Sequence, residues 1–507
     1  MTSEIPGFWR FAEAHPDALA AVDHSGRRWT FGALQDRVDR TSHWLRSRGV
    51  GPDGALALVA GNSVEYLTVV LAAAQIGTRY TLVNRHLAGP EIGYILADCA
   101  PRLVVTDRAL APVVGPLIDD LERLACLDPV PGWTSIGEVL AEQPPGPPPD
   151  RRAGSIMLYT SGTSGRPKGV RSTLPPATPE EAANRATFVV VRFGIDLGEH
   201  IGDGVHLVTS PLYHAAPISN ALNALHVGHT VVVMERFDAV ASLALIEEHA
   251  VTSTHVVPTM MKRWLDLDDD RRASFDVGSM RWLIHAAAPC PPDVKRRIID
   301  WFGPVVFEYY ASTEAGGTAI TSEDWLRHPG SVGRPWPGAD VRILDDDGGD
   351  VAPGVVGQVF LRNNRPFEYL NDPEKTAANR RGDYVTVGDL GSLDPDGYLF
   401  LADRRTDLIL SGGVNVYPAE IEAVLIAHPR VADAAAIGVP DGDLGEVVHA
   451  VVEPRGDPAG LAAALLEHCA TQLAAFKRPR TIELRDRLPR SEAGKLLRRV
   501  LREEHAV

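Results

Sequence analysis

The sequence predicts an α/β protein whose large N-terminal domain holds two α/β sheets and a small β-rich subdomain, followed by a small α+β C-terminal domain. Three observations predict this fold class. Helical and strand patterns alternate through the first 110 residues, the alternation returns between 205 and 310, and short strands separated by turn signals follow residue 341. The length of 507 residues suits two to four domains.

The first alternation comprises a helical pattern at 31–49, an apolar strand at 55–60, a helical pattern at 63–77 and an apolar strand at 102–106. Helices between strands are typical of a parallel sheet, because a parallel pair needs a long crossover connection. A proline-rich stretch at 143–150 then predicts a stiff connector.

The second alternation predicts a second α/β sheet. Its strands are expected at 205–209, 230–234, 254–257 and 281–285, and its helices at 218–227 and 239–249.

After residue 341 the pattern changes to short strands with Asp-Gly turns, which predicts the β-rich subdomain. A charged run then precedes a tail of about a hundred residues with helices expected at 418–427 and 458–476. We therefore place the domains at 1–403 and 408–507, with a hinge at 404–407.

Composition limits the partners. A formal net charge of −16 and a pI near 5.5 disfavour nucleic acid and anionic membranes. The four cysteines form no CxxC pair, which argues against a cysteine zinc site or a disulfide framework and favours a reducing cytoplasm. The N-terminus lacks the pattern of a signal peptide, and the longest apolar stretch, 67–76, is too short to span a bilayer. We expect a cytoplasmic protein that binds small molecules; a homodimer stays open.

The segment 158–170, Leu-Tyr-Thr-Ser-Gly-Thr-Ser-Gly-Arg-Pro-Lys-Gly-Val, is the most informative motif. Glycines let backbone N–H groups approach an anion, hydroxyls add donors, and a lysine adds positive charge. A flexible linker would not require a preceding strand or the closing Pro-Lys-Gly. The sequence therefore predicts a phosphate-binding loop formed by Thr160, Ser161, Gly162, Thr163, Ser164, Gly165 and Lys168. It is not of the Walker type, because Lys168 precedes Gly169 rather than Ser or Thr.

Four more segments follow this loop in one order over about 340 residues. They are Tyr309-Tyr-Ala-Ser-Thr-Glu314, Gly388-Asp389, Asp403-Arg404 through Glu422, and Pro489-Arg490 to Gly494-Lys495. Together the five segments resemble the ANL superfamily of adenylate-forming enzymes, on its acyl-CoA synthetase branch of actinobacterial type. The resemblance implies a mobile C-terminal domain and two steps, in which a carboxylate first forms acyl-AMP from ATP and a thiol then displaces AMP.

The resemblance also implies roles for single residues. The 160–168 loop would hold the β- and γ-phosphates of ATP, Tyr310 would stack on adenine, and Thr313 would lie near the α-phosphate. Glu314 would bind Mg²⁺, a hard cation that prefers carboxylate and phosphate oxygen. Asp389 would accept the ribose hydroxyls, and Arg404 would contact ribose and phosphate. For Tyr310 and Asp389, a buried core aromatic and a turn aspartate are the plain structural alternatives.

The C-terminal segment would supply the remaining groups. Lys495 would bridge the carboxylate and the α-phosphate during adenylation. Gly412 and Gly413 would let pantetheine pass close to the backbone, and Lys477 would meet the CoA phosphates. A tight turn and solvated basic side chains explain these residues equally well.

The acyl group would lie against two further segments. His214, in Pro-Leu-Tyr-His-Ala-Ala-Pro, would line the acyl tunnel and gate the thiol path, although a satisfied core histidine explains it equally well. The segment that contains Ala286, Ala287 and Ala288 would form another wall, and its small side chains leave room for a bulky acid.

Some positions depart from the family pattern. Thr406 stands at the hinge position that is usually Asp or Lys, and Val387 replaces a common threonine. Val414 and Ala311 are also unusual. Thr406 and Val387 leave open whether both half-reactions run efficiently.

The sequence thus predicts an acyl-CoA ligase that uses ATP, Mg²⁺ and CoA on a hydrophobic carboxylic acid, with fatty acids and bulky polycyclic terpenoid or steroid acids of a lipid or natural-product pathway as candidates. The alternatives are an enzyme that runs one half-reaction, a ligase that loads a carrier protein, and a non-catalytic acyl-nucleotide binder.

Overall fold

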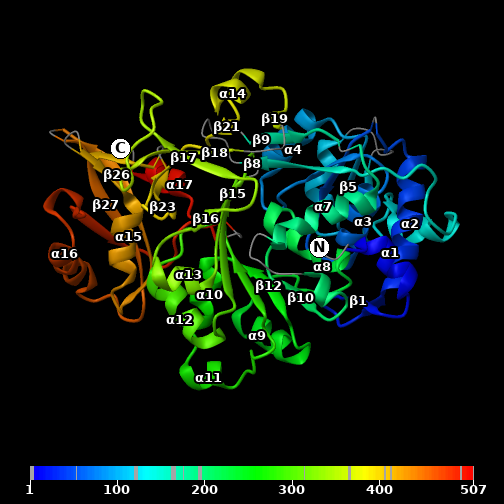
Figure 1. Cartoon of the computed structure of the whole chain (residues 1–507), viewed down its shortest axis with the longest axis horizontal. Coiled ribbons are helices and arrows are strands. Elements are labelled where there is room, and N and C mark those ends of the chain that lie inside the picture. Colours follow the sequence, from blue (N-terminus) through cyan, green and yellow to red (C-terminus); the bar gives the residue numbers. More distant parts are fainter. Residues whose placement is uncertain are drawn as a thin grey trace. The chain divides into compact units, whose positions relative to one another are not determined.

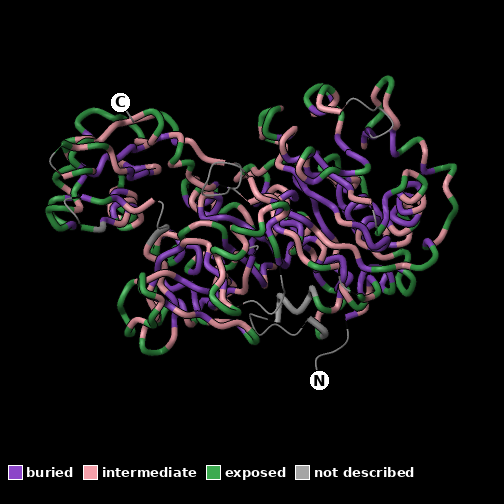
Figure 2. The backbone as a smooth tube through the Cα atoms, turned by 90° about the horizontal axis from the view of Figure 1, so that it is seen from above, coloured by how far each residue is buried: buried purple, intermediate pink, exposed green. Residues whose placement is uncertain are grey.

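The computed structural model describes most of the chain and divides it into two compact units. The described residues are 5–52, 54–118, 124–160, 167–174, 176–191, 197–312, 314–362, 367–404, 407–411, 414–442, 444–491 and 494–505. Unit 1 comprises Met1–Val256, Asp269–Ile284 and Asn363–Arg380, and unit 2 comprises Val257–Asp268, His285–Arg362 and Arg381–Val507. Figure 1 labels the elements of both units, and Figure 2 shows buried segments enclosed by exposed loops within each.

Unit 1 contains an eight-stranded sheet that confirms the first predicted α/β sheet. Its strand order is β19-β9-β8-β4-β3-β5-β6-β7, with the pairs from β8 to β7 parallel. The strands are β3 (Leu56–Val59), β4 (Arg79–Leu82), β5 (Leu103–Thr106), β6 (Leu124–Cys126), β7 (Thr134–Ser135), β8 (Ser155–Thr160), β9 (Lys168–Ser172) and β19 (Phe367–Tyr369). The helical segments that go with them are α3 (Val64–Ala74), α4 (Gly89–Cys99), α5 (Ala111–Val114), η1 (Gly115–Leu117), α6 (Ile136–Val139), η3 (Leu140–Glu142) and α14 (Pro373–Ala378).

Unit 1 also contains six strands in the order β13-β12-β10-β11-β1-β2, which confirms the second predicted sheet. The strands are β1 (Leu19–Val22), β2 (Arg28–Thr30), β10 (Val205–Val208), β11 (Thr230–Val233), β12 (Ser253–Val256) and β13 (Trp282–His285). The helical segments here are α1 (Gly7–Ala14), α2 (Phe31–Ser47), α7 (Pro179–Val191), η4 (Leu197–His200), α8 (Ala215–His226), α9 (Ala239–Glu248) and α11 (Asp269–Ala273). The hairpin of β1 and β2, which the sequence analysis did not predict, joins this sheet because β1 pairs in parallel with β11.

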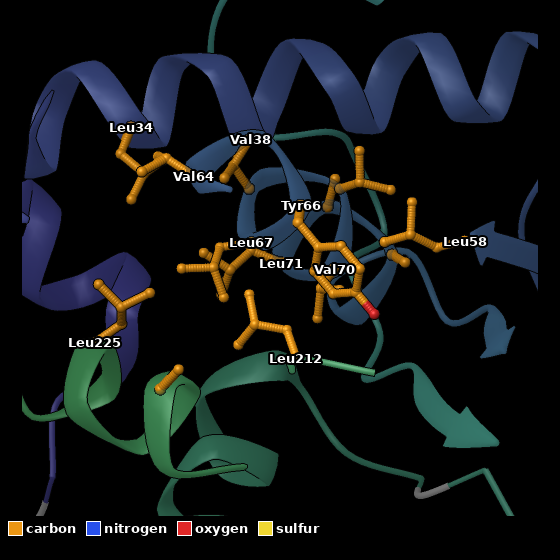
Figure 3. Packing of buried hydrophobic residues seen from close by; sticks show 14 of the residues in the cluster. Leu34, Val38, Leu58, Val64, Tyr66, Leu67, Val70, Leu71, Leu212 and Leu225 are labelled. Carbon is orange, nitrogen blue, oxygen red and sulfur yellow. The ribbon is translucent and has the colours of Figure 1, made fainter. Parts of the chain in front are cut away.

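The main core of unit 1 surrounds α3. Nine of the eleven residues of this helix are buried, because it is apolar on nearly every side. Figure 3 shows Leu34 and Val38 of α2, Leu67 of α3 and Leu225 of α8 directed toward one another in this cluster. The cluster therefore joins helices that belong to both sheets of unit 1.

The proline-rich segment 143–150 lies along α2, although five of its eight residues are exposed. Its backbone carbonyls accept hydrogen bonds from side chains along α2. The contacts are Arg40 Nη1 to Gln143 O at 2.7 Å, His43 Nε2 to Gly146 O at 3.1 Å and Arg46 Nη1 to Pro149 O at 2.5 Å. Because the prolines of this segment have no N–H to donate, side chains of α2 supply donors to its carbonyl groups.

Unit 2 contains three sets of strands. The first is β14 (Val306–Ala311), β15 (Gly317–Ile320) and β16 (Arg334–Pro335), which pair antiparallel in that order. The second confirms the β-rich subdomain and comprises β17 (Asp340–Leu344), β18 (Gly357–Arg362), β20 (Arg380–Arg381), β21 (Tyr384–Val385), β22 (Asp389–Leu393) and β23 (Leu399–Arg404). The helices that accompany these strands are α10 (Pro258–Leu265), α12 (Pro292–Phe302) and α13 (Ser322–Arg327).

The third set of strands and its helices form the α+β segment predicted after the hinge. Its strands are β24 (Ile409–Ser411), β25 (Val414–Val416), β26 (Val431–Asp441), β27 (Gly445–Pro454) and β28 (Thr481–Leu484). Its helical segments are α15 (Pro418–Ile426), α16 (Leu461–Gln472), η5 (Ala475–Lys477) and α17 (Arg498–Glu504). In Figure 1, α15 lies beside β26, and α17 contacts the same strand. The boundaries at 404–407 stay a prediction.

One strand of the region expected to be the β-rich subdomain lies elsewhere. β19 pairs with β9 in unit 1, so residues 367–369 belong to the eight-stranded sheet and not to the β-rich subdomain. A short strand pattern predicts a strand but not its partner. Among the described helices, none is both long and apolar enough to cross a membrane.

Candidate active site

The predicted phosphate loop joins two antiparallel strands in unit 1. Thr160 ends β8 and lies directly opposite Lys168, which begins β9. Ser161, Gly162, Thr163, Ser164 and Gly165 lie outside the described residues. The two described ends are thus held side by side by the β8–β9 ladder, as a short loop around an anion requires.

Aromatic packing fixes the lysine end of this hairpin. The Lys168 ammonium lies 5.2 Å from the ring centroid of Tyr369, which belongs to β19. A Cβ on Gly169 would lie only 3.0 Å from the Tyr159 ring, so a larger residue next to Lys168 would have to displace that ring. The Tyr159 hydroxyl in turn donates to Asp98 Oδ2 at 2.6 Å. These contacts hold the strand backbone from which Lys168 projects.

The predicted adenine and metal residues lie on the hairpin of β14 and β15 in unit 2. Tyr310 pairs with Thr318, and the turn between the strands carries Glu314, which is buried. Thr313 lies outside the described residues. Gly317 closes the hairpin because a Cβ there would lie 2.0 Å from the Tyr310 carbonyl oxygen and 2.6 Å from Trp336. The hairpin therefore presents Tyr310 and Glu314 from one short segment.

The structure brings together two of the predicted nucleotide residues that are far apart in sequence. The Tyr310 hydroxyl donates to Asp389 Oδ2 at 2.5 Å, and Asp389 is 8% exposed. Asp389 begins β22 directly after Gly388, whose φ of 86° favours glycine. In the β22–β23 ladder Asp389 lies opposite Arg404, whose backbone, but not whose side chain, is described. The positions predicted for adenine and ribose are therefore adjacent within unit 2.

Lys495 lies in a tight turn near the C-terminus. Ser491 Oγ accepts from the Lys495 N–H at 3.2 Å, and Ser491 N–H donates to the Lys495 carbonyl at 2.9 Å. Arg490 donates to the Gly494 carbonyl at 2.7 Å and forms an ion pair with Asp433 at 2.5 Å. Backbone and side-chain hydrogen bonds thus hold the backbone of Lys495 in place.

Gly494 is required in this turn for two reasons. Its φ is +71°, and an added Cβ would lie 2.2 Å from Thr259 Oγ1 at the start of α10. The turn of the predicted catalytic lysine therefore packs closely against the N-terminal end of α10 within unit 2.

Of the predicted CoA residues, only Lys477 lies within the described part of the chain. Gly412 and Gly413 lie outside the described residues, as does the hinge residue Thr406. The Lys477 ammonium binds both carboxylate oxygens of Glu420, at 2.8 and 2.7 Å. A phosphate would have to compete with Glu420 for this lysine.

The predicted acyl residues lie in different units. His214 is half-buried at the N-terminus of α8 in unit 1, and its ring lies 4.4 Å from the ring of Tyr213. In unit 2, Ala286 is buried, whereas Ala287 is exposed with a φ of +76°. A non-glycine residue rarely adopts this conformation and is strained there. Ala288 is half-buried.

The sequence reasoning missed a fully buried ionic group beneath β14. The Lys295 ammonium lies 2.5 Å from Glu308 Oε2, and His285 Nε2 lies 3.6 Å from the same oxygen. Burial raises the pKa of Glu308, which the nearby lysine charge opposes. Lysine is rare here, with six in the chain, so its presence inside the helical pattern of α12 was the available signal. The group supports the strand that carries Tyr310 two residues further on.

Comparisons with known proteins identify the family of the chain. The family model described as AMP-binding enzyme matches residues 8–368, and that of the AMP-binding enzyme C-terminal domain matches residues 420–495. Long-chain-fatty-acid–CoA ligase FadD13 of Mycobacterium tuberculosis is 32% identical over 94% of this chain and 93% of its own. Fatty acid–[acyl-carrier-protein] ligase ScoC of Streptomyces coeruleorubidus is 32% identical over 97% of this chain and 95% of its own. The structure of amide bond synthetase McbA from Marinactinospora thermotolerans superposes with a TM-score of 0.85 at 28% identity, covering 99% of each chain.

Proposed function

Because the chain belongs to the AMP-binding enzyme family along both its N-terminal and its C-terminal part, we propose that it is an AMP-forming acyl-CoA ligase. The observation that carries the proposal is the hydrogen bond from Tyr310 to Asp389, which joins two nucleotide positions 79 residues apart. A core tyrosine or a turn aspartate would not need this pairing. Relatives named as CoA and carrier-protein ligases match nearly the whole chain, which supports the same reaction class.

In the first step a carboxylate oxygen of the acid attacks the α-phosphorus of ATP, and the bond to the bridging oxygen of pyrophosphate breaks. The loop that ends at Lys168 stabilises the charge that develops on the departing phosphates. Lys495 bridges the carboxylate and the α-phosphate. Tyr310 and Asp389 position adenine and ribose, so that the phosphorus faces the acid.

Glu314 is the residue we propose for Mg²⁺. It is a buried carboxylate on the turn that follows Tyr310, and one protein carboxylate with phosphate oxygens is a donor set that suits this ion. When bound, Mg²⁺ neutralises phosphate charge. Glu314 fixes the place at which the phosphates are held.

In the second step the CoA sulfur attacks the acyl carbon, and the bond from that carbon to the AMP oxygen breaks. We propose that residues 408–507 reorient about the hinge at 404–407 between the steps, so that Gly412 and Gly413 replace Lys495 beside the acyl group. Asp407, directly after the hinge, is held by Arg498 at 3.3 Å and Arg502 at 3.1 Å, which supports movement of the segment as one body.

The substrate we propose is a hydrophobic acid, with long-chain fatty acids first and bulky polycyclic acids second. The names of two relatives support fatty acids. The small side chains of Ala286, Ala287 and Ala288 support a bulky acid, with His214 proposed to line the same path. Loading of a carrier protein is the second candidate, because ScoC matches the chain as well as FadD13 does.

The test incubates the protein with Mg-ATP, a panel of fatty, aryl and polycyclic acids, and either CoA or a carrier protein, with detection by mass spectrometry. Acyl-CoA plus AMP from one class of acid supports the proposal and identifies the substrate. Lys495→Ala should lose about 3–4 kcal/mol of transition-state stabilisation in adenylation, or 10²–10³ in rate. It should still convert presynthesised acyl-AMP. A protein that makes no thioester from acid or from acyl-AMP would overturn the proposal.

A further inference from the structure

Two histidines and a glutamate meet on the face of the C-terminal sheet that α17 covers, outside the candidate active site. His449 lies on β27, Glu483 lies on β28, and His505 directly follows α17. One possible ligand atom from each lies within 4.8 Å of the others. The sequence showed no motif here, because the three residues are spread over 57 positions and are joined only by strand pairing.

The distances suit one small cation. Glu483 Oε2 lies 2.9 Å from His505 Nε2 and 3.7 Å from His449 Nε2. Ligand atoms bound tetrahedrally to Zn²⁺ at about 2.0–2.1 Å are about 3.3 Å apart. The His505–Glu483 separation is that of a hydrogen bond, and the His449–Glu483 separation is 0.4 Å longer than the tetrahedral value, so a bound ion would replace the hydrogen bond and draw His449 closer.

The other ring nitrogens are already occupied, which directs both Nε2 atoms toward Glu483. His505 Nδ1 lies 2.7 Å from the Leu501 carbonyl, which can only accept, so Nδ1 carries hydrogen. His449 Nδ1 lies 2.6 Å from Thr481 Oγ1. Metal-binding histidines are oriented in this way by a partner on the second nitrogen.

His449 Nε2 is the decisive atom. The side chain is 10% exposed, the atom itself is buried, and no hydrogen-bond partner reaches it within the described residues. Burying such a nitrogen without a partner is costly, so its orientation toward Glu483 and His505 calls for a ligand.

The charges around the cluster allow a cation. Arg485 binds the other carboxylate oxygen, Glu483 Oε1, at 2.7 Å and so leaves Oε2 for the histidines. The same guanidinium pairs with Glu504 at 2.7 Å, which offsets its charge. Arg485 therefore orients Glu483 without occupying the face toward the two rings.

We propose that His449, Glu483 and His505 bind one Zn²⁺ ion through Nε2, a carboxylate oxygen and Nε2, with the fourth position left to water. Histidine and carboxylate ligands in a compact three-residue site favour Zn²⁺ over Mg²⁺ or Ca²⁺. The ion would fasten the end of α17 to β27 and β28. The same helix holds Asp407 through Arg498 and Arg502, so the ion would stiffen the segment between the hinge and Lys495.

The test compares the wild type with His505→Ala and Glu483→Gln, and uses His428→Ala as the matched control. His428 lies on the same segment but outside the cluster, with its ring 5.4 Å from that of His468. Each full-length protein is stripped with a chelator, dialysed against buffered Zn²⁺ and analysed for metal content and thermal unfolding. Co²⁺ replaces Zn²⁺ in a second set, so that visible absorption reports the coordination geometry.

Wild type and His428→Ala should each retain one zinc and unfold at a higher temperature with the ion present. His505→Ala and Glu483→Gln should bind more weakly by more than about tenfold and lose both the stabilisation and the tetrahedral Co²⁺ spectrum. Glu483→Gln keeps the size of the side chain, so a misfolded His505→Ala would not obscure the result. A wild type that retains no zinc, or variants that bind it as tightly as the wild type, would overturn the proposal.

Discussion

Gly494→Ala should separate the two half-reactions, because it perturbs the turn of Lys495 and nothing proposed for the thiol step. Gly494 has a φ of +71°, and its missing Cβ leaves the space that Thr259 Oγ1 occupies. An alanine there must strain its backbone and push against the start of α10. Both effects disfavour the arrangement in which the Lys495 turn packs against α10.

The minimum loss in adenylation rate follows from the backbone strain at residue 494. Holding alanine in the left-handed region costs about 1–2 kcal/mol. At about 1.4 kcal/mol per tenfold, adenylation should slow by at least about 5- to 30-fold. The contact of 2.2 Å with Thr259 Oγ1 adds to this loss. Thr259→Ala in the same chain should recover the steric part, because the nearest remaining atom is then 3.2 Å away on Val257.

The assay measures pyrophosphate release in single turnover and, separately, thioester formation from presynthesised acyl-AMP. Gly382→Ala is the matched control, because Gly382 has a φ of +58° and no atom within 4 Å of an added Cβ. Gly382→Ala therefore introduces the same kind of backbone strain but no close contact of the added Cβ. Wild-type adenylation in Gly494→Ala would refute the reasoning, and so would an equal loss in both half-reactions.

Three further predictions concern stability and the nucleotide. Lys295→Met alone should lower the free energy of unfolding by about 3–5 kcal/mol, because it leaves Glu308 buried without its partner. The double variant Lys295→Met/Glu308→Leu should recover most of the lost free energy of unfolding, as measured in denaturant titrations. A Lys295→Met variant as stable as the wild type would contradict this prediction. Burial lowers the pKa of His226 from 6.5 to about 4, so the unfolded chain binds the proton first as the pH falls. Stability should therefore decrease from pH 6.5 toward 4, and His226→Gln should reduce that slope in melting temperatures; a slope unchanged by the substitution would exclude this residue. Tyr310→Phe removes a hydrogen bond to Asp389 worth about 1.5–3 kcal/mol, so calorimetry should show ATP binding weakened by about 10- to 100-fold, whereas unchanged affinity would argue against the pair.

The sequence predicted which elements exist far better than which elements pair. Strands such as β3, β5 and β10 were found within a residue or two, because apolar runs and their flanking turns are local features. The pairing of β1 with β11 and of β19 with β9 was not predicted, because pairing depends on contacts between segments that are distant in the chain. For the same reason the proline-rich segment was expected to be a bare connector and not a partner of α2.

In the candidate site, too, local features were predicted and features formed by packing were not. Motifs located Lys168, Tyr310 and Asp389, whose neighbours in sequence carry the pattern. The Lys295–Glu308 pair and the histidine cluster at Glu483 were missed, because each forms only after helices and strands have packed. The hydrogen bond from Tyr310 to Asp389 likewise needed the fold to bring β14 and β22 together.

The fact that β19 belongs to unit 1 has a practical consequence for protein engineering. Residues 363–380 interrupt the stretch that otherwise belongs to unit 2, so neither unit is a continuous piece of the gene. A chimera that exchanges unit 1 with a relative must therefore transplant this insert too. A single crossover before it would leave β9, and with it Lys168, facing a foreign neighbour strand.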